Sequence, residues 1–146
     1  MAVLPFFSQE TPYSCVPACL RMGLAHFGIE ASEDEVRRRA YTTLWGTNAR
    51  DAVACIRSFG LLAEEKKDAS LVDLHQWLAG GLFPILLIDL RPLHNEAGRH
   101  AIVAEAVTDD ELIYLDPLAG RRVMALGRMD QAWRLNRCRA ILIWPG

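Results

Sequence analysis

The strongest constraint on the fold is a change in hydrophobic periodicity near the middle of the chain. Up to about residue 80 the apolar residues recur at helical spacing, and after it they gather in short runs typical of strands. The expected helices cover about residues 15–27, 32–39, 47–59 and 70–79, with a short edge strand between them at 61–66. Helices first and strands afterwards predict an α+β domain, in which the helices pack on an antiparallel sheet.

The second half is expected to form an antiparallel meander. Its predicted strands are residues 83–90, 100–107, 111–116, 121–126 and 138–144. The stretch "TDD" separates the second of these from the third, and "DPLAG" separates the third from the fourth. One further helical turn is expected near residues 129–134, before the last strand.

The first helix is expected to be the central element of the fold. It opens with "CVPACL", where Pro17 lies in the first turn and costs little, and Gly28 is suited to end it. Little of its circumference is polar, which predicts burial on most sides. The second helix begins with the capping-box pattern Ser32-x-x-Glu35.

Composition excludes several classes of protein. With 146 residues, 51% hydrophobic and 23% charged, the chain is expected to form a single domain over residues 1–146. A net charge of −2 and one short basic cluster at 37–39 argue against a nucleic-acid partner. The N-terminal residues lack the pattern of a secretory signal, and no apolar run approaches the roughly 18 residues of a membrane span. We therefore expect a cytoplasmic protein without direct membrane insertion.

The four cysteines are expected to stay reduced, and Cys15 has the position of a reactive one. No C-x-x-C pair occurs, so we expect no zinc site, and nothing in the sequence calls for a cofactor. Cys15 stands at a helix start, where unpaired backbone N–H groups stabilise a thiolate. Taken alone, such a cysteine is more often a small core residue. Cys19, Cys55 and Cys138 are expected to be core residues.

His100 and Asp116 are candidates to activate that thiol. They lie sixteen residues apart on two strands of an expected hairpin. If the turn is centred near Thr108, they fall about opposite one another and on the same face. The carboxylate would then orient the imidazole and leave its other nitrogen for a thiol. Alternatively, His100 is a surface residue and Asp116 a turn former.

Gln9 is the fourth candidate. Acyl transfer by a thiolate creates a negative oxygen that needs at least two fixed donors. The backbone N–H of Cys15 supplies one, and the Gln9 amide, six residues earlier on a short loop with a proline, is a candidate for the other. The alternative is a solvated loop glutamine.

Together, the stretches "QETPYSCVPACL", "HAIVAEAV" and "YLDPLAG" carry a family resemblance. With the order of helices and strands over nearly the whole chain, they resemble the papain-like cysteine peptidases. The sequence is most similar to the bacteriocin-processing, double-glycine leader peptidases, which occur as the peptidase domain of bacteriocin ABC exporters and as stand-alone relatives. The resemblance implies Gln9 as oxyanion-hole donor, Cys15 as nucleophile, His100 as general base and then acid, and Asp116 as the orienting carboxylate.

The resemblance also implies a class of partner, and the sequence departs from the family pattern at one point. It implies a peptide or protein substrate, such as a precursor with a double-glycine leader, and a peptide-exporting ABC transporter as a further partner. The family usually has Asp-Cys-Gly, whereas this chain has Ser14-Cys15-Val16. The family glycine lets a substrate backbone approach closely, and valine fills that position here.

Three other functions remain open at this point. The same groups would serve an amidase, transamidase or acyltransferase, in which the acyl-enzyme goes to an acceptor other than water. A relative that binds peptides without cleaving them would have the same fold. A metal hydrolase would use Cys15, His100 and Asp116 as ligands.

Overall fold

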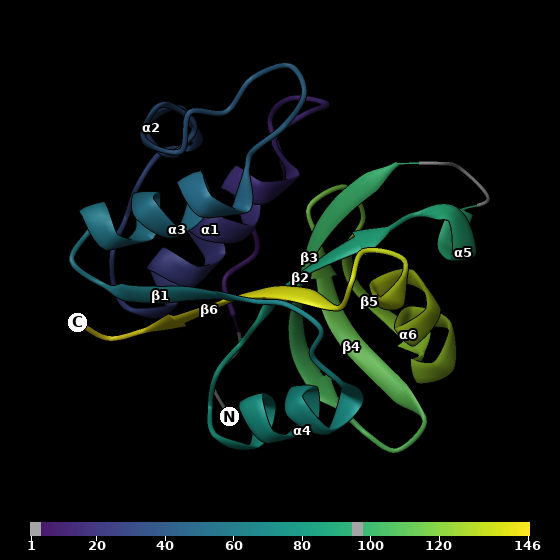
Figure 1. The fold of residues 1–146 in the computed structure, drawn as a ribbon. Helices are drawn as coiled ribbons and strands as arrows, with labels where there is room; N and C mark the ends of the chain where they lie inside the picture. Colours follow the sequence, from purple (N-terminus) through teal and green to yellow (C-terminus); the bar gives the residue numbers. More distant parts are fainter. Residues whose placement is uncertain (1–3, 95–97) are drawn as a thin grey trace.

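The computed structural model describes residues 4–94 and 98–146 and confirms the α+β class (Figure 1). Its strands form one six-stranded antiparallel sheet in the order β1-β6-β2-β3-β4-β5. The elements are α1 (Cys15–His26), α2 (Glu33–Arg39), α3 (Ala49–Ser58), β1 (Leu62–Lys66), α4 (Leu71–Ala79), β2 (Ile85–Asp89), α5 (Arg91–His94), β3 (Arg99–Val107), β4 (Glu111–Asp116), β5 (Gly120–Ala125), α6 (Leu126–Arg134) and β6 (Arg139–Trp144).

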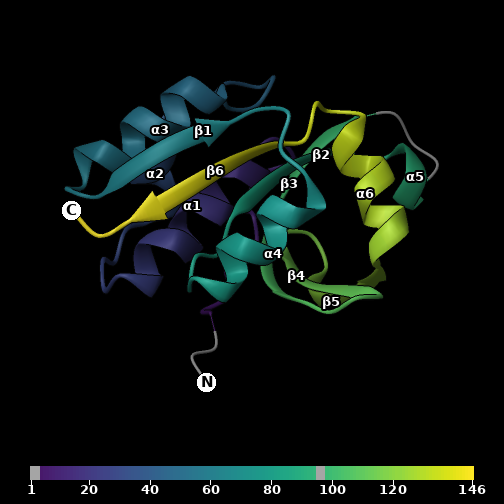
Figure 2. The same cartoon turned by 60° about the horizontal axis from the view of Figure 1, so that its bottom comes forward.

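The strands β2 to β5 form the predicted meander, but the last strand lies elsewhere. β6 does not follow β5; it lies between β1 and β2, as Figures 1 and 2 show. The helix α6 packs against β2 and carries the chain back across the sheet. Burial explains the placement, because the four central residues of β6 are apolar and buried, whereas β1 ends in "EEK" and is suited to an edge.

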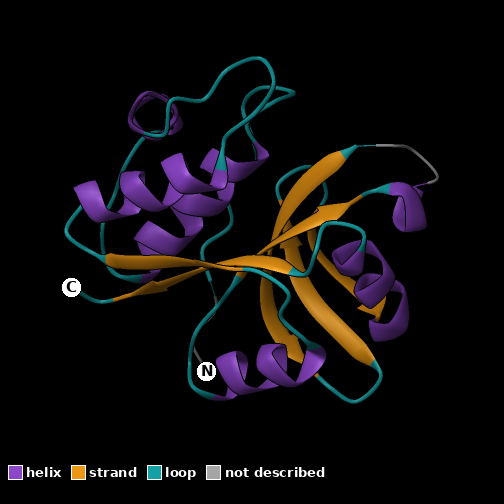
Figure 3. Ribbon diagram, in the orientation of Figure 1, coloured by secondary structure: helices purple, strands orange, loops and turns teal. Residues whose placement is uncertain are grey.

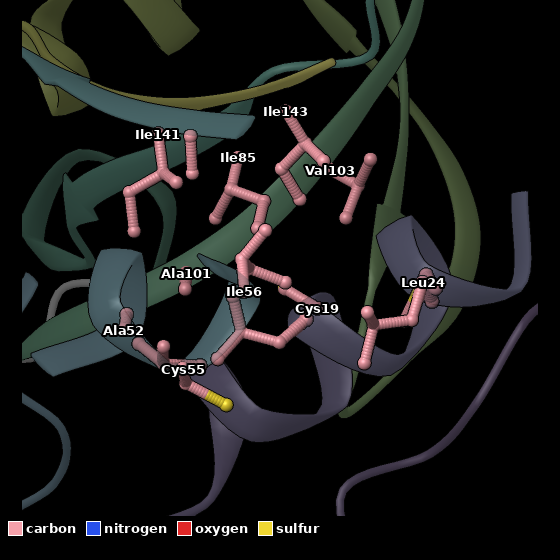
Figure 4. Packing of buried hydrophobic residues seen from close by; sticks show 14 of the residues in the cluster. Cys19, Leu24, Ala52, Cys55, Ile56, Ile85, Ala101, Val103, Ile141 and Ile143 are labelled. Atoms are coloured by element: carbon pink, nitrogen blue, oxygen red, sulfur yellow. The ribbon is translucent and has the colours of Figure 1, made fainter. Parts of the chain in front are cut away.

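The sheet separates two hydrophobic cores, and helices cover both of its faces (Figure 3). Side chains alternate along a strand, so neighbouring residues of one strand enter different cores. On β2, Ile85 and Leu87 pack with α1 and α3, whereas Leu86 and Ile88 pack with α4 and α6. Figure 4 shows the first of these cores, where Ile85 and its strand neighbours face the helices.

The helix α1 is the buried central element that its sequence predicts. Its residues from Val16 to Leu20 are all buried, as are Met22 and Leu24. Gly23 allows the helix to approach the sheet closely, because a Cβ atom there would lie 2.6 Å from Cδ1 of Ile143 on β6.

The helix starts follow the predicted capping chemistry in part. Ser32 accepts a hydrogen bond from the Glu35 N–H at 3.1 Å, but the Glu35 carboxylate pairs with Arg39 instead of completing the capping box. A complete capping box occurs at α4, between Ser70 and Asp73. The expected helix at 47–59 begins only at Ala49, since Asn48 caps it.

Three further segments differ from the sequence expectation. The single turn near 129–134 is part of the longer helix α6. Residues Arg91–His94, expected in a loop, form the short helix α5. Cys138 precedes β6 instead of beginning it, because its φ of 46° is left-handed and does not fit an extended strand.

Candidate active site

The candidate residues meet because the ends of several elements lie at one edge of the sheet. β3 and β4 are antiparallel, so His100, near the start of β3, lies near Asp116, the last residue of β4. Cys15 is the first residue of α1. It lines a cleft of about 260 Å³ together with His100.

His100 and Asp116 form a buried hydrogen bond. The His100 Nε2 atom lies 2.7 Å from Asp116 Oδ1, and each residue is only 6% exposed. The same carboxylate oxygen accepts a hydrogen bond from the Leu118 N–H at 2.9 Å, which fixes it in the β4–β5 turn. A carboxylate accepts, so Nε2 carries the hydrogen and Nδ1 is left to accept the thiol proton.

A β-bulge places His100 and Asp116 on the same face of the sheet. The turn is centred on residues 109 and 110, later than expected, since the Thr108 N–H donates to Glu111 O at 2.9 Å. Without further change this register would set Asp116 opposite Val103, on the face that His100 does not occupy. One extra residue at Glu105 restores the match, and Asp116 falls opposite Ile102, diagonal to His100. The predicted meeting is therefore confirmed, but the predicted register is wrong.

The environment of His100 favours the imidazolium. Burial, the largest influence, lowers its pKa, but hydrogen bonds to Asp116 and to the Cys15 side chain outweigh that effect. The negative charges of both partners act in the same direction. The result is a pKa raised from 6.5 to about 9. The raised pKa suits His100 to act as a general acid after it has accepted a proton.

This pKa predicts an alkaline limit to activity. Catalysis through an imidazolium acid should be retained below about pH 9 and decline as the pH rises through that value. The same group contributes to the free energy of unfolding fully below pH 6.5, and this contribution should be lost as the pH rises towards about 9. A profile of kcat/KM against pH measures the first effect. An alkaline limb near pH 7 would contradict the assignment.

The start of α1 leaves donors available at Cys15. Ser14 occupies the N-cap position but makes no side-chain bond to the helix. Its hydroxyl turns back to the preceding loop, where it accepts from the Thr11 N–H at 3.0 Å and donates to Thr11 O at 3.1 Å. The Ser14 side chain therefore does not cap the N–H groups of the first helical turn. The backbone N–H of Cys15 can donate a hydrogen bond to an oxyanion.

The loop before Cys15 is held from two further directions. The Gln9 N–H donates to Pro117 O at 3.1 Å, beside the catalytic candidate Asp116. The Glu10 N–H donates to the fully buried carboxylate of Glu33 at 2.9 Å. These bonds fix the loop against both the β4–β5 turn and α2.

The Gln9 amide lies in this loop with one hydrogen committed. Its Nε2 atom donates to Thr11 O at 2.8 Å, and its Oε1 atom is buried without a hydrogen-bond partner among the described residues. An amide nitrogen carries two hydrogens, so one remains. The structure thus brings the Gln9 backbone to the Asp116 turn, and its oxyanion role stays a prediction.

The cleft has two walls. On the helix side it is lined by Val16, by Trp45, which is 97% exposed, and by the start of α3. On the sheet side, Leu87, Arg99, Asn136 and Arg139 line it. Arg99 and Arg139 stand at the starts of strands, and His100 lies at the same end of the sheet. This shared position is a sequence signal that they can line one cleft with His100.

Of the four tryptophans, at positions 45, 77, 133 and 144, Trp45 alone lines this cleft. Trp133 is buried and packs edge-on against Trp77. Trp144 lines a separate hollow beside β1.

The other cysteines are core residues, as expected. Burial raises the pKa of Cys19 well above its usual value, and it raises that of Cys55 to about 11. Burial also raises the pKa of Cys138. All four cysteines are free thiols. Cys15 is partly exposed, and the other three are buried.

The described residues contain neither a metal-binding cluster nor a membrane-spanning helix. No group of three or more His, Cys, Asp or Glu side chains in residues 4–94 and 98–146 is arranged to hold a metal ion. Over the same residues, the helices are too short or too polar to cross a membrane.

Comparison with known proteins identifies the relatives of this fold. A model of the peptidase C39 family matches residues 4–144. The peptidase domain of Streptococcus ComA, a bifunctional ABC transporter of a quorum-sensing pathway, superimposes with a TM-score of 0.82 at 22% identity, covering 99% of this chain and 100% of that one. A double-glycine motif protease from an AMS/PCAT transporter, solved with its leader peptide, gives 0.82 at 18% identity, over 99% and 94% of the two chains.

A third solved structure broadens the comparison. A putative C39-like peptidase from Bacillus anthracis superimposes with a TM-score of 0.81 at 13% identity, over 98% of this chain and 95% of the other. Among curated proteins, none matches this sequence.

Proposed function

Because this chain belongs to the peptidase C39 family, a family of cysteine peptidases, we propose that it cleaves a precursor peptide with Cys15, His100 and Asp116 as its triad. The observation that carries the proposal is the position of His100, which is hydrogen-bonded to Asp116 at 2.7 Å, has its pKa raised by the Cys15 side chain and lines one cleft with Cys15. The imidazole between a carboxylate and a thiol is the arrangement that nucleophilic catalysis by cysteine needs.

Each group has a defined part in the proposed reaction. His100 Nδ1 takes the Cys15 proton, and the thiolate attacks the scissile carbonyl carbon. The Cys15 N–H and the free N–H of Gln9 hold the resulting oxyanion. The imidazolium gives its proton to the leaving amine as the C–N bond breaks, and a thioester remains on Cys15. His100 then takes a proton from water, which hydrolyses the thioester and releases the thiol.

The proposed substrate is a precursor with a double-glycine leader. Two solved relatives are parts of ABC transporters, and one is a double-glycine motif protease bound to a leader peptide. We extend this substrate class to the present chain and propose that its precursor is the cargo of a peptide exporter. Val16 lies in the cleft wall next to the nucleophile, where the family has a glycine, so the preference for Gly-Gly is itself part of the test.

The test is cleavage of synthetic precursors. Peptides with Gly-Gly, Ala-Ala or Leu-Leu at the end of a leader are incubated with the protein, and the products are weighed by mass spectrometry. We expect one cut after Gly-Gly, with product masses that together exceed the precursor by one water. The Cys15→Ala protein is the control.

Other outcomes distinguish the alternatives. If an added amine acceptor is coupled to the leader in place of water, the protein is a transferase. If the precursors bind with measurable affinity but none is cut, the chain is a peptide-binding relative and the proposal is wrong.

A further inference from the structure

Asn136 is a largely buried residue that lines the same cleft as Cys15 and His100. It is only 7% exposed, and its side chain makes no hydrogen bond with any residue that the structure describes. Its amide atoms are not among the buried side-chain atoms that lack a partner, so they are open to the space of the cleft. An amide that is held beside a nucleophile and not used within the described protein is available to pair with a bound peptide.

The segment that carries Asn136 is fixed in a strained conformation. The next two residues, Arg137 and Cys138, have left-handed φ angles of 58° and 46°, and Asp68 in the facing loop has one of 55°. The Asp68 N–H donates to Arg137 O at 2.8 Å, and the two side chains form an ion pair at 3.1 Å. Such backbone strain in residues other than glycine persists where the surroundings hold it, often at functional sites.

Beside Asn136, the sheet side of the cleft is positively charged. Arg99 and Arg139 both line the cleft, and none of the described residues that line it is acidic. They lie at the same edge because Arg99 begins β3, Arg139 begins β6, and β2 pairs with both strands. The cleft thus presents two guanidinium groups and an amide on one side.

Only one of these two arginines forms an ion pair with a described residue. Arg139 binds Glu65 through two of its nitrogens, one of them at 2.9 Å. Arg99 is exposed and forms no ion pair with the described residues. Its cross-strand neighbour Asp89 gives both carboxylate oxygens to Arg91 instead. Arg99 therefore offers an unpaired cation in the cleft.

We propose that this side of the cleft binds an acidic residue of the substrate, with the carboxylate on Arg99 and the adjoining peptide group on the Asn136 amide. The proposal rests on the function proposed above and names a substrate preference for it. A guanidinium binds a carboxylate through two parallel hydrogen bonds, and Asn136 can donate to a peptide carbonyl and accept from a peptide N–H. The ligand is thus a peptide with Asp or Glu near the scissile bond.

Matched peptides test the preference. Precursors carry Glu or Gln at each of the three positions on either side of the cut, and kcat/KM is measured for each pair. At one position we expect the Glu peptide to be cleaved about 10-fold faster at low salt, with a smaller ratio at high salt. Arg99→Gln should remove this ratio. The control Arg128→Gln, at an exposed arginine of α6 outside the cleft, should keep it.

Variants at Asn136 test the second contact. Asn136→Ala should raise KM for the Glu and Gln peptides alike by about 10-fold, because both lose a peptide contact. Asn136→Asp should penalise the Glu peptide more, since it sets a negative charge beside the bound carboxylate. Thermal unfolding of each variant shows whether the fold is retained. Unchanged KM in both folded variants would overturn the role of Asn136.

The outcomes distinguish a failure of the acidic subsite from a failure of the proposed peptidase function. If Glu and Gln peptides are cleaved equally at every position while Cys15→Ala is inactive, the acidic subsite is wrong and the peptidase function stands. If peptides with a free C-terminus are preferred over amidated ones whatever their side chains, the site binds the terminal carboxylate of the peptide. The proposal of a side-chain carboxylate is then wrong. If the wild-type protein cleaves no peptide, the proposed function itself fails.

Discussion

Replacing Cys15 with alanine is expected to lower kcat for peptide hydrolysis by at least ~10⁴-fold. In the proposed reaction the thioester forms on this sulfur, and the remaining groups can only polarise the carbonyl and bind the substrate. Hydrolysis of a cleavable precursor, followed by mass spectrometry, measures the loss. Cys138→Ala is the matched control, because it removes a thiol from the end of the sheet without changing the triad.

The same variants should differ in labelling by a thiol-directed alkylating probe at pH 7. The wild-type protein is expected to take one label, at Cys15. Burial explains the selectivity, since a thiol with a pKa of about 11, such as Cys55, is ionised to only about 10⁻⁴ at that pH. Cys15→Ala should take no label in the folded state, and Cys138→Ala should still take one. Rapid labelling of Cys19 or Cys55 would contradict the assignment.

Replacing Asp116 with asparagine is expected to lower kcat by about 10²–10⁴-fold with little change in shape. The amide keeps a hydrogen-bonding group for His100 and for the Leu118 N–H, but it removes the negative charge that stabilises the imidazolium. It also allows the wrong imidazole tautomer. Rates with a saturating precursor measure the effect.

A second readout separates catalysis from folding in this variant. The alkaline limb of the pH profile should move below about 9, because one of the groups that raise the pKa of His100 is lost. If the role of Asp116 were purely structural, the substitution would lower the melting temperature and leave the alkaline limb of the pH profile in place. Asp130→Asn, on α6, serves as a control, since its carboxylate pairs with Arg134 away from the cleft.

Local patterns predicted the elements well where one pattern determined one element. The apolar start of α1 with Pro17, and the capping residue Ser32, led to the right helices. The hairpin that joins His100 to Asp116 was found from its turn residues. In each case the signal lies within a few positions of the structure that it specifies.

The remaining features depend on residues far apart in the sequence. The place of β6 is decided by the return of α6 across the sheet, which no local pattern encodes. The bulge at Glu105 is held by Arg121 at 2.7 Å and by the Leu4 N–H at 3.3 Å, one from β5 and one from the N-terminal segment. Asn136 reads as an ordinary polar residue after a helix. Only the fold shows that it faces the same cleft as Cys15.

The position of β6 also has a consequence for synthesis on the ribosome. β6 is the strand that pairs with β1 in this sheet, and it also pairs with β2, although β1 and β2 are made much earlier. The nascent chain can complete the β2–β5 hairpins while β1 waits for its neighbour. The cleft gains Arg139 and its sheet-side support only when residues 139–144 emerge. The cleft is therefore complete only after β6 has been made and paired with β2.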